Sequence, residues 1–378
     1  MVAAIVLVDT MFYAAIAPLL PYYKHHFHID KSTAGVLAAA YAAGTLLGAI
    51  PSGWLAARLG VRRTVLFGLA LMVVSSVVFG FAHHVALLDA ARFVQGVGGA
   101  ASWAAGMAWL IARAPGSRRG EMVGTALGAA IVGSLLGPVL GTVASQTSPQ
   151  LVFSLVGVVG IALGAWTLTE SAPPPSGGRG FGAFGPALRD ARVLAGMWLT
   201  VLASLLYGTL AVLAPLRLDH LGASGVTVGL AFLLASAAAA GASPVVGRVS
   251  DRRGWRVPVR ACLCVSALAA LLLPLPSSAP LLFALVVLCD PFFGASYAPA
   301  GAMISDGSER AGLDQGYAFA LFNLAWATGQ VVGEAGSAGL AQATSDAVPY
   351  GTLAGLCVLT LVAVTRSGPR TQPASQLS

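Results

Sequence analysis

The chain has 378 residues, of which 57% are hydrophobic and 9% charged, and its mean hydropathy is +0.82. Soluble domains carry roughly 25% charged residues, so this composition excludes a soluble globular protein and predicts an integral membrane protein. At about 20 to 25 residues per membrane-spanning helix, the length allows about a dozen helices. The loops left between them are too short for a soluble catalytic domain.

The net charge of +7 indicates topology rather than nucleic-acid binding. Seventeen of the 21 Lys and Arg residues lie on one set of loops and three, Lys24, Lys31 and Arg217, on the opposite set, while Arg92 lies within a helix. By the positive-inside rule this asymmetry places both termini in the cytosol. Because lysine is scarce beside abundant arginine, alanine and glycine, we expect a bacterial protein of the inner membrane. No nucleic-acid partner is expected.

The apolar stretches predict an all-α fold of twelve transmembrane helices in two six-helix halves. The predicted helices cover residues 2–23, 33–56, 63–82, 86–112, 120–146 and 150–169, and then 192–216, 224–248, 257–275, 279–304, 314–341 and 346–366. The chain is accordingly divided into an N-terminal half (1–169), a cytoplasmic linker (170–191) and a C-terminal half (192–378). Proline and glycine in the linker oppose a long helix, so we expect an irregular strap with one surface helix near Phe184.

The first predicted helix carries a carboxylate, Asp9, among Val, Leu, Met and Phe. A charged carboxylate within a membrane helix is costly, so such a residue is usually functional and faces a cavity. The alternative is that Asp9 lies near the cytosolic interface and extends toward water. Both interpretations are open from the sequence.

A short basic loop occurs twice, 194 residues apart, each time between two predicted helices. The first copy contains Gly53, Leu55, Arg58, Gly60, Arg62 and Arg63, and the second contains Gly247, Asp251, Arg252 and Gly254. A repeat of this period in an apolar chain indicates two similar halves. The pattern resembles the signature loop G-x-L-x-D-R-x-G-R-[RK] of the major facilitator superfamily, with Ala57 where the family usually has Asp. In the family this Asp helps to latch the cytoplasmic side.

The resemblance extends to the first helix. Asp9 lies ahead of a Pro-x-x-Pro run, Pro18 to Pro21, which is similar to the pattern of vesicular amine transporters and their drug-exporting relatives. In those proteins the equivalent acid recognises the cationic substrate. They also have an acid near the position of Asn323, and here this chain departs from them.

The fourth predicted helix contains the segment RFVQGVG at residues 92–98, which resembles the family motif R-x-x-Q-G-x-G-A. A buried arginine is costly unless it is paired. We therefore expect Arg92 to have an acid or the carbonyl groups of a helix C-terminus as its partner, and Asp89 is the nearest acid. The resemblance implies a part in proton coupling, and a structural pair at the cytosolic mouth is the alternative.

The fifth predicted helix contains Gly133, Gly137, Pro138 and Gly141, which resemble the antiporter motif G-x-x-x-G-P-x-x-G. The next position, glycine in the full motif, is Thr142. Glycines four residues apart make a flat face for close helix contact, and proline removes a helix hydrogen bond and bends the axis. In the family this motif marks exporters that exchange protons. Close helix packing alone is the alternative.

The tenth predicted helix carries a second intramembrane acid, Asp290, followed by Phe293 and Tyr297. An acid beside aromatic rings can bind an organic cation by its charge and through the ring faces. A proton can occupy the same carboxylate when the cation leaves, which is the simplest chemistry of exchange. A local role in helix packing is the alternative.

The eleventh predicted helix echoes the fifth. Gly329 matches Gly133, Gly333 matches Gly137, and Glu334 takes the place of Pro138. Glu334 is either a third coupling carboxylate or a partner for a group on the cytosolic side.

Repeat transporters bind their substrate near the bilayer midplane, between the halves, and work by alternating access. We predict that Asp9, Asp290, Glu334 and Arg92 serve substrate binding and proton coupling. The remaining predicted cavity residues are Tyr13, Trp103, Phe293, Tyr297, Asn323 and Trp326. The sequence thus predicts a proton-driven antiporter that exports small amphipathic or cationic organic compounds. We expect a monomer in the lipid bilayer, driven by the proton gradient, with neither cofactor nor metal.

Two other functions are possible. Within the same class, the alternative is a transporter of sugars or amino acids, or a proton symporter. Few polar cavity residues are expected, which argues against sugars because sugars need many hydrogen-bond partners. The alternative from another class is a membrane sensor or an intramembrane enzyme. The predicted helices contain no HExxH or GxSxG motif and no metal-spaced His/Cys set, so an enzyme is not expected.

Overall fold

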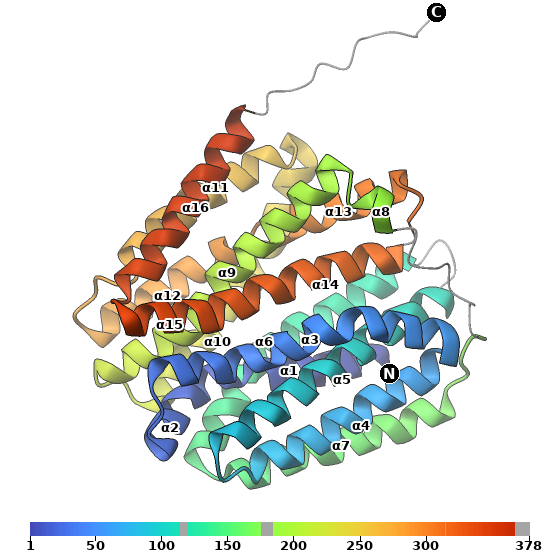
Figure 1. The fold of residues 1–378 in the computed structure, drawn as a ribbon, viewed down its shortest axis with the longest axis horizontal. Coiled ribbons are helices and arrows are strands. Elements are labelled where there is room, and N and C mark those ends of the chain that lie inside the picture. Colours follow the sequence, from blue (N-terminus) through green and yellow to red (C-terminus); the bar gives the residue numbers. More distant parts are fainter. Residues whose placement is uncertain (114–118, 175–183, 314, 367–378) are drawn as a thin grey trace, which may run out of the picture.

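The computed structural model describes residues 1–113, 119–174, 184–313 and 315–366, and this part of the chain is helical without a β-strand. The long helical segments number six in each half, which confirms the predicted fold class (Figure 1). The N-terminal half consists of α1 (Val2–Ala14) with α2 (Ile16–Phe27), α3 (Lys31–Leu59), α4 (Val61–Gly80), α5 (Val85–Arg113), α6 (Arg119–Gln146) and α7 (Pro149–Thr169). The C-terminal half consists of α9 (Ala191–His220), α10 (Gly225–Arg253), α11 (Arg256–Leu272), α12 (Ala279–Gly294) with α13 (Tyr297–Arg310), α14 (Gln315–Val331) with the π-helix η3 (Val332–Gly336) and α15 (Ser337–Ala343), and α16 (Ala347–Arg366).

Between the halves lies the short helix α8 (Phe184–Ala187), where one surface helix was expected. The linker residues 175–183 lie outside the described residues. Within the described chain, nine helical stretches are long and apolar enough to cross a membrane. The chain is therefore a multi-pass membrane protein.

The 194-residue repeat is visible in α3 and α10. Both helices have 29 residues, and their bounds are offset by 194 positions. Each begins at a side-chain cap, since Asp30 accepts from the Thr33 N–H and Ser224 from the Thr227 N–H. Each ends at a glycine with positive φ, 89° at Gly60 and 77° at Gly254. A side chain would be strained in that conformation.

Three predicted helices are interrupted. The first divides at Ala15 and the tenth at Ala295 and Ser296, because Pro18 and Pro299 lack the N–H that would bond the carbonyl group four residues earlier. The eleventh contains the π-helical turn η3, a feature found frequently at functional sites. All three interruptions lie near the centre of the membrane-spanning segments.

The two halves meet mainly through α3 and α10, with a further contact of α2 with α9. α3 packs against α14, η3 and α15, and α10 packs against α6 and α2. Figure 1 shows α3 and α14 side by side where the halves join. Each half also has a large hydrophobic core of its own.

The ends of the molecule differ in charge. We call the end with the two basic loops the arginine-rich end. At the opposite end, ion pairs join the halves: Lys31 Nζ lies 2.5 Å from Asp346 Oδ1, and Lys24 Nζ lies 3.7 Å from Asp219 Oδ2. Arg217 also pairs with Asp346, at 3.6 Å. Each of the three basic residues that the sequence places at this end therefore binds an acid, and the halves are closed against each other there.

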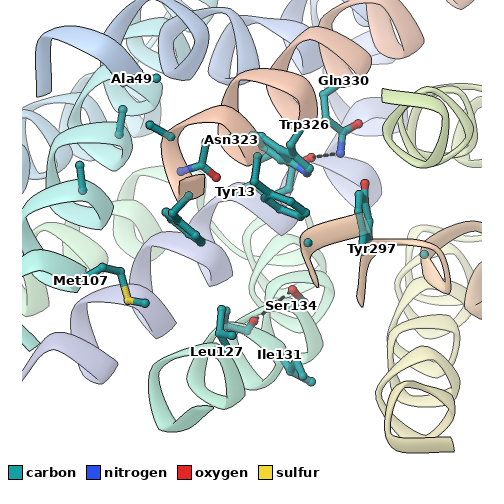
Figure 2. Close-up of a pocket in the computed structure, with 18 of the residues that line it drawn as sticks. Tyr13, Ala49, Met107, Leu127, Ile131, Ser134, Tyr297, Asn323, Trp326 and Gln330 are labelled. Atoms are coloured by element: carbon teal, nitrogen blue, oxygen red, sulfur yellow. Dashed lines mark hydrogen bonds between the residues drawn. The ribbon is translucent and has the colours of Figure 1, made fainter. Parts of the chain in front are cut away.

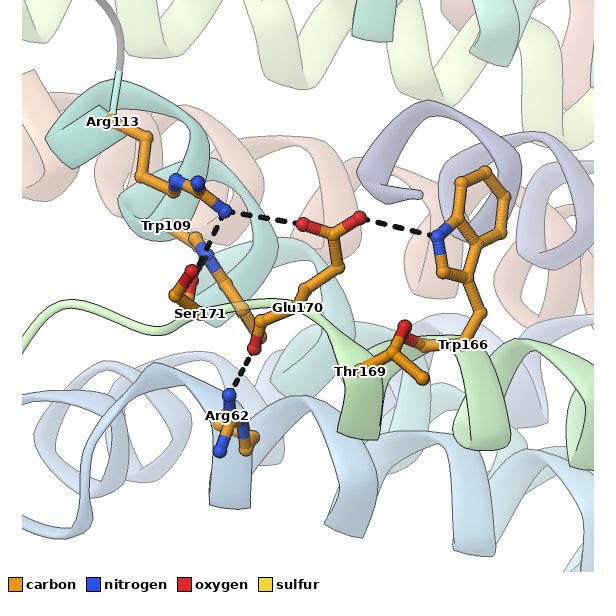
Figure 3. A network of polar contacts seen from close by, with 7 residues as sticks. All are labelled: Arg62, Trp109, Arg113, Trp166, Thr169, Glu170 and Ser171. Carbon is orange, nitrogen blue, oxygen red and sulfur yellow. Dashed lines mark hydrogen bonds and ion pairs between the residues drawn. The ribbon is translucent and has the colours of Figure 1, made fainter.

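At the arginine-rich end, the start of the linker is bound to the N-terminal half (Figure 3). The Arg62 guanidinium donates to the Glu170 carbonyl oxygen, and Arg113 Nη1 lies 3.1 Å from Glu170 Oε2. The Trp109 indole donates to the Ser171 carbonyl oxygen at 3.2 Å. Arg62, which belongs to the first basic loop, thus binds the linker in this structure.

Candidate transport cavity

A cavity of about 1820 Å³ lies between the halves. Its walls reach Trp54 and Arg58 near the end of α3 and Pro173 in the linker, so it opens at the arginine-rich end. It is larger than the 300–1000 Å³ typical of ligand pockets, because it is open on one side. Figure 2 shows Tyr13, Asn323, Trp326, Gln330 and Tyr297 around it.

Two carboxylates of the C-terminal half line this cavity. Asp290, on α12, is 5% exposed, and its Oδ2 accepts from the Tyr207 hydroxyl at 3.3 Å. Pro291 and Gly294 line the cavity beside it. Phe293 does not: this ring is 1% exposed and belongs to the core of the half.

The position of Phe293 follows from helix geometry. With Leu282, Val286 and Cys289 it forms a stripe at intervals of four, three and four residues, all within the same core cluster. The predicted cavity position of Phe293 is therefore wrong. The adjacent face of α12, which carries Asp290, turns toward the cavity.

Glu334 lies in η3 and is 1% exposed while lining the cavity. A π-helical turn leaves carbonyl groups without regular helix partners. Here the Gly333 carbonyl oxygen accepts from the Thr209 hydroxyl, at 3.3 Å, and from the Ser337 hydroxyl. These two bonds support the turn that carries Glu334. The carboxyl lies beside the Tyr13 hydroxyl of the other half and interacts with the charge of Arg92.

Tyr13 of the N-terminal half contacts residues of the C-terminal half. Gln330 Nε2 donates to the Tyr13 hydroxyl at 3.0 Å, and the ring centroids of Tyr13 and Trp326 lie 5.5 Å apart. Asn323, Trp326, Gln330 and Glu334 all line the cavity from α14 and η3. This helix therefore supplies the most polar wall of the site.

Tyr297 and its neighbours form an aromatic wall. The Tyr297 hydroxyl shares a 2.9 Å hydrogen bond with that of Ser204. Its ring stacks on Tyr207, with the centroids 5.9 Å apart, and contacts Phe322 edge-on at 6.0 Å. Rings of this kind offer faces to an apolar or cationic ligand.

Asp9 is placed differently. It is 1% exposed and is not among the residues that line the cavity. Its Oδ2 accepts from the Tyr41 hydroxyl at 2.9 Å and from the Trp103 indole at 3.1 Å. Gly99 permits this close approach, because a Cβ there would lie 3.0 Å from Asp9 Oδ1. Trp103 does not line the cavity either, and it stacks instead on Phe319 at 5.8 Å.

Arg92 is a fully buried cation, 1% exposed. It donates to Gln95 Oε1 at 2.8 Å and to the carbonyl oxygens of Phe12 and Tyr13 at 3.4 and 3.3 Å. These carbonyl groups are free because α1 ends two residues later. The partners are thus helix-end carbonyls rather than Asp89. Its guanidinium also lies over the rings of Tyr13 and Tyr41, 5.8 and 5.3 Å from their centroids.

The glycines of the antiporter-like motif pack α6 against α1 and α2. A Cβ at Gly133 would lie 2.5 Å from the Leu7 carbonyl oxygen, and those at Gly137 and Gly141 would meet Ala14 and Ala15. Pro138 lines the cavity, and α6 runs on through it.

The basic-loop residues lie at the cavity mouth or beyond it. Gly53 and Arg58 line the mouth, and the Arg58 guanidinium lies 5.0 Å from the centroid of the Trp54 ring. Gly53 and Gly247 lie inside α3 and α10 with open space around them, so the tight turns belong to Gly60 and Gly254 instead. Arg252 is exposed. The Asp251 side chain lies outside the described residues.

Sequence reasoning missed four residues of the site: Tyr41, Tyr207, Ser204 and Gln330. Each is a hydrogen-bonding residue within an apolar helix, and that is the signal by which they could have been found. Among the residues described, no group of three or more His, Cys, Asp or Glu could hold a metal ion.

The family model described as Major Facilitator Superfamily matches residues 2–312 and, in an overlapping match, residues 196–378. The chain belongs to the major facilitator superfamily. It is therefore a transporter rather than an enzyme.

Individual relatives match mostly in part. The MFS-type transporter ppzB of Metarhizium majus is 33% identical over 123 residues, which cover 31% of this chain but only 27% of that protein. The uncharacterized MFS-type transporter YcaD of Escherichia fergusonii is 26% identical over 283 residues, covering 73% of this chain and 72% of that protein. The arabinose-proton symporter of Escherichia coli is 34% identical over 109 residues, covering 29% of this chain and 23% of that protein.

The fold is shared with solved transporters. A bacterial homologue of the human lysosomal transporter Spinster, in an inward-facing and unoccupied conformation, has a TM-score of 0.75 at 15% identity, with 97% of this chain and 94% of that chain covered. At this identity the likeness shows the fold alone.

Proposed function

We propose that this protein is a proton-coupled antiporter that exports small amphipathic or cationic organic compounds by alternating access. It would act as a monomer in a bacterial inner membrane, without a cofactor, and with its arginine-rich end in the cytosol. One observation carries this proposal. Asp290 and Glu334 are buried carboxyl groups that line, together with aromatic rings, a cavity that is open at that end and closed at the other.

The chemistry follows from burial. A carboxylate in a site of low dielectric is costly unless a proton or another cation neutralises it. In the outward-facing state, the carboxyl takes a proton and the cation leaves. In the inward-facing state, the carboxyl gives that proton to cavity water and binds the cation from the cytosol. The rings of Tyr207, Tyr297 and Trp326 hold the apolar part of the substrate.

Asp9 and Arg92 take a supporting part in this proposal. Asp9 lies off the cavity, and its carboxylate orients Tyr41 and Trp103. Arg92 interacts with the charges of both Asp9 and Glu334, one from each half. A change of charge on either acid therefore alters the attraction between the halves.

The direction of transport rests on the motif in α6. Its three glycines let α6 approach the break between α1 and α2 closely, which places a packed hinge beside the cavity. The resemblance of this motif to that of proton-exchanging exporters supports export.

A sugar transporter is the second candidate, favoured by the partial match to an arabinose-proton symporter. Against it stands the character of the cavity, whose walls are largely Ala, Gly, Ile, Leu and aromatic residues. A sugar needs hydrogen-bond partners for several hydroxyl groups, whereas a lipophilic cation needs an acid and ring faces.

The test is proton movement in liposomes that contain the purified protein and a preset pH gradient. A lipophilic cation should release protons through the parent protein and not through Asp290→Asn, while Asp9→Asn should respond more slowly. Arabinose and a neutral amphiphile serve as comparison solutes. Flux driven by these neutral solutes, with normal behaviour of Asp290→Asn, would refute cation–proton exchange.

A further inference from the structure

The deep end of the cavity holds acceptor atoms without donors. Glu334 Oε2 and Gln330 Oε1 are buried and have no hydrogen-bond partner in the part of the chain that is described. Both residues line the cavity and are at most 5% exposed. Buried acceptors are nearly always satisfied in native proteins, so these two oxygens are candidates to accept hydrogen bonds from a ligand.

The two oxygens belong to one surface. Gln330 and Glu334 are four residues apart, on α14 and the π-helical turn that follows, so their side chains project from the same side. The amide of Gln330 is oriented by its donation to the Tyr13 hydroxyl, which leaves the amide oxygen as its free group. The backbone of Gly208 on α9 lies close to this oxygen, since a Cβ there would lie 2.8 Å from it.

The rings and acceptor oxygens around this position determine which head group can bind. Trp326 and Tyr297 present rings to the same cavity, and both free oxygens are acceptors, one of them on an acid. A matching head group has a positive charge and at least two N–H donors. A quaternary ammonium ion has the charge but no N–H donor.

We propose that Gln330 and Glu334 form the head-group subsite for a protonated primary or secondary amine. Its N–H groups donate to Gln330 Oε1 and Glu334 Oε2, and its apolar body lies along Trp326 and Tyr297. This inference rests on the proposed function and makes it specific, because it separates amines with N–H donors from quaternary cations. It also assigns the head group to the C-terminal half rather than to Asp9, whose Oδ2 already accepts two hydrogen bonds away from the cavity.

The test is a binding experiment with matched ligands. An arylalkyl primary amine, its trimethylammonium analogue and the neutral alcohol of the same skeleton are titrated calorimetrically into the purified protein in detergent. The parent should bind the primary amine about tenfold or more tightly than the trimethylammonium analogue. The reason is that a hydrogen bond to a charged group changes an affinity by roughly that factor. The alcohol should bind more weakly than either cation.

Three variants locate the subsite. Glu334→Gln and Gln330→Leu should each bring the ratio of the two cation affinities close to one, while Asp9→Asn should keep the ratio of the parent. If Glu334→Gln does not fold, Gln330→Leu alone decides, with thermal unfolding as the check on its fold. A parental ratio that survives in Gln330→Leu or Glu334→Gln, or that disappears in Asp9→Asn, would overturn the subsite.

The same titrations refute the proposed function by a different result from the one that refutes the subsite. If the parent binds neither cation, or binds the alcohol as tightly as both, then cation recognition itself is wrong. If the parent binds both cations equally and more tightly than the alcohol, cation recognition stands and the subsite is refuted.

Discussion

Helices α6 and α14 occupy matching places in the two halves. Both pack through glycines against a neighbouring helix, but they present different residues to the cavity. In α6, Gly133 lies against the Leu7 carbonyl oxygen; in α14, Gly329 lies against that of Val201. After the second glycine of each pair, α6 has Pro138 and α14 is followed by Glu334. Both of these residues line the cavity.

The difference shows that the same helix packing can present an apolar residue to the cavity in one half and a carboxyl group in the other. The glycines hold each helix close to the first helix of its half, which fixes the direction of the residue that follows. In the N-terminal half this residue is apolar, and in the C-terminal half it is a carboxyl on a π-helical turn. The cavity thus has an uncharged wall facing a charged one.

The largest expected effect on the export rate comes from substitution of Glu334, compared with substitution of Pro138 at the matching position. Glu334→Gln should lower cation export roughly 30-fold or more, the cost of losing one partner of a buried charge interaction. Pro138→Ala should lower it much less, because α6 is already continuous at Pro138. Export rates of both variants in liposomes test this, and equal losses would mean that the two walls do not differ in function.

A smaller effect is expected from the glycines, and it should be equal in the two halves. Gly137→Ala and Gly333→Ala each place a Cβ against a neighbouring helix, on Ala14 and on the Leu205 carbonyl oxygen. Overpacking of this kind costs about 1–3 kcal/mol, measurable as a lower midpoint of thermal unfolding in detergent. Gly164→Ala is the control, because nothing lies within 4 Å of its added Cβ. A loss in only one half would show that the helices are not packed alike.

The smallest effect concerns the caps of α3 and α10. The backbone N–H of Thr33 donates to Asp30 and holds the pKa of that carboxyl below its ordinary value of 3.8. A lowered folded-state pKa adds stability that is present above 3.8 and is lost as the pH falls through the lowered value. Ser224 does not titrate in this range, so only the α3 cap is sensitive to acid.

Amide hydrogen exchange at Thr33 and Thr227 measures this contrast. After correction for intrinsic rates, protection at Thr33 should fall as the pH is lowered below 3.8, while protection at Thr227 stays constant. A parallel fall at both amides would indicate general acid unfolding instead.

Much of the fold could be predicted because it depends on patterns that the sequence displays directly. Apolar length predicts spans, and the 194-residue repeat predicts two halves. The interruptions at Ala15 and Ala295 were missed although Pro18 and Pro299 cause them. Proline is tolerated in many membrane helices, so its presence does not say whether the helix bends or breaks.

The site was less predictable because it depends on which face of a helix meets which neighbour. The sequence locates an acid such as Asp9 but not the rings of Tyr41 and Trp103 that hold it away from the cavity. Phe293 was misplaced because it was assigned by its nearness in sequence to Asp290, whereas its helical spacing from Val286 and Cys289 places it in the core. The ion pair between Lys31 and Asp346 joins residues 315 positions apart, and no local pattern indicates such a contact.

The most direct test of cation–proton exchange on the charged wall is proton release when a primary amine saturates the purified protein. A pH indicator in weakly buffered detergent solution reports the protons, and calorimetry reports the amine bound. The parent should release about one proton per amine, because binding of the cation and of the proton are linked. Asp9→Asn should still release protons, and the double variant Asp290→Asn with Glu334→Gln should release none. Undiminished release by that double variant, or its loss in Asp9→Asn alone, would contradict the account.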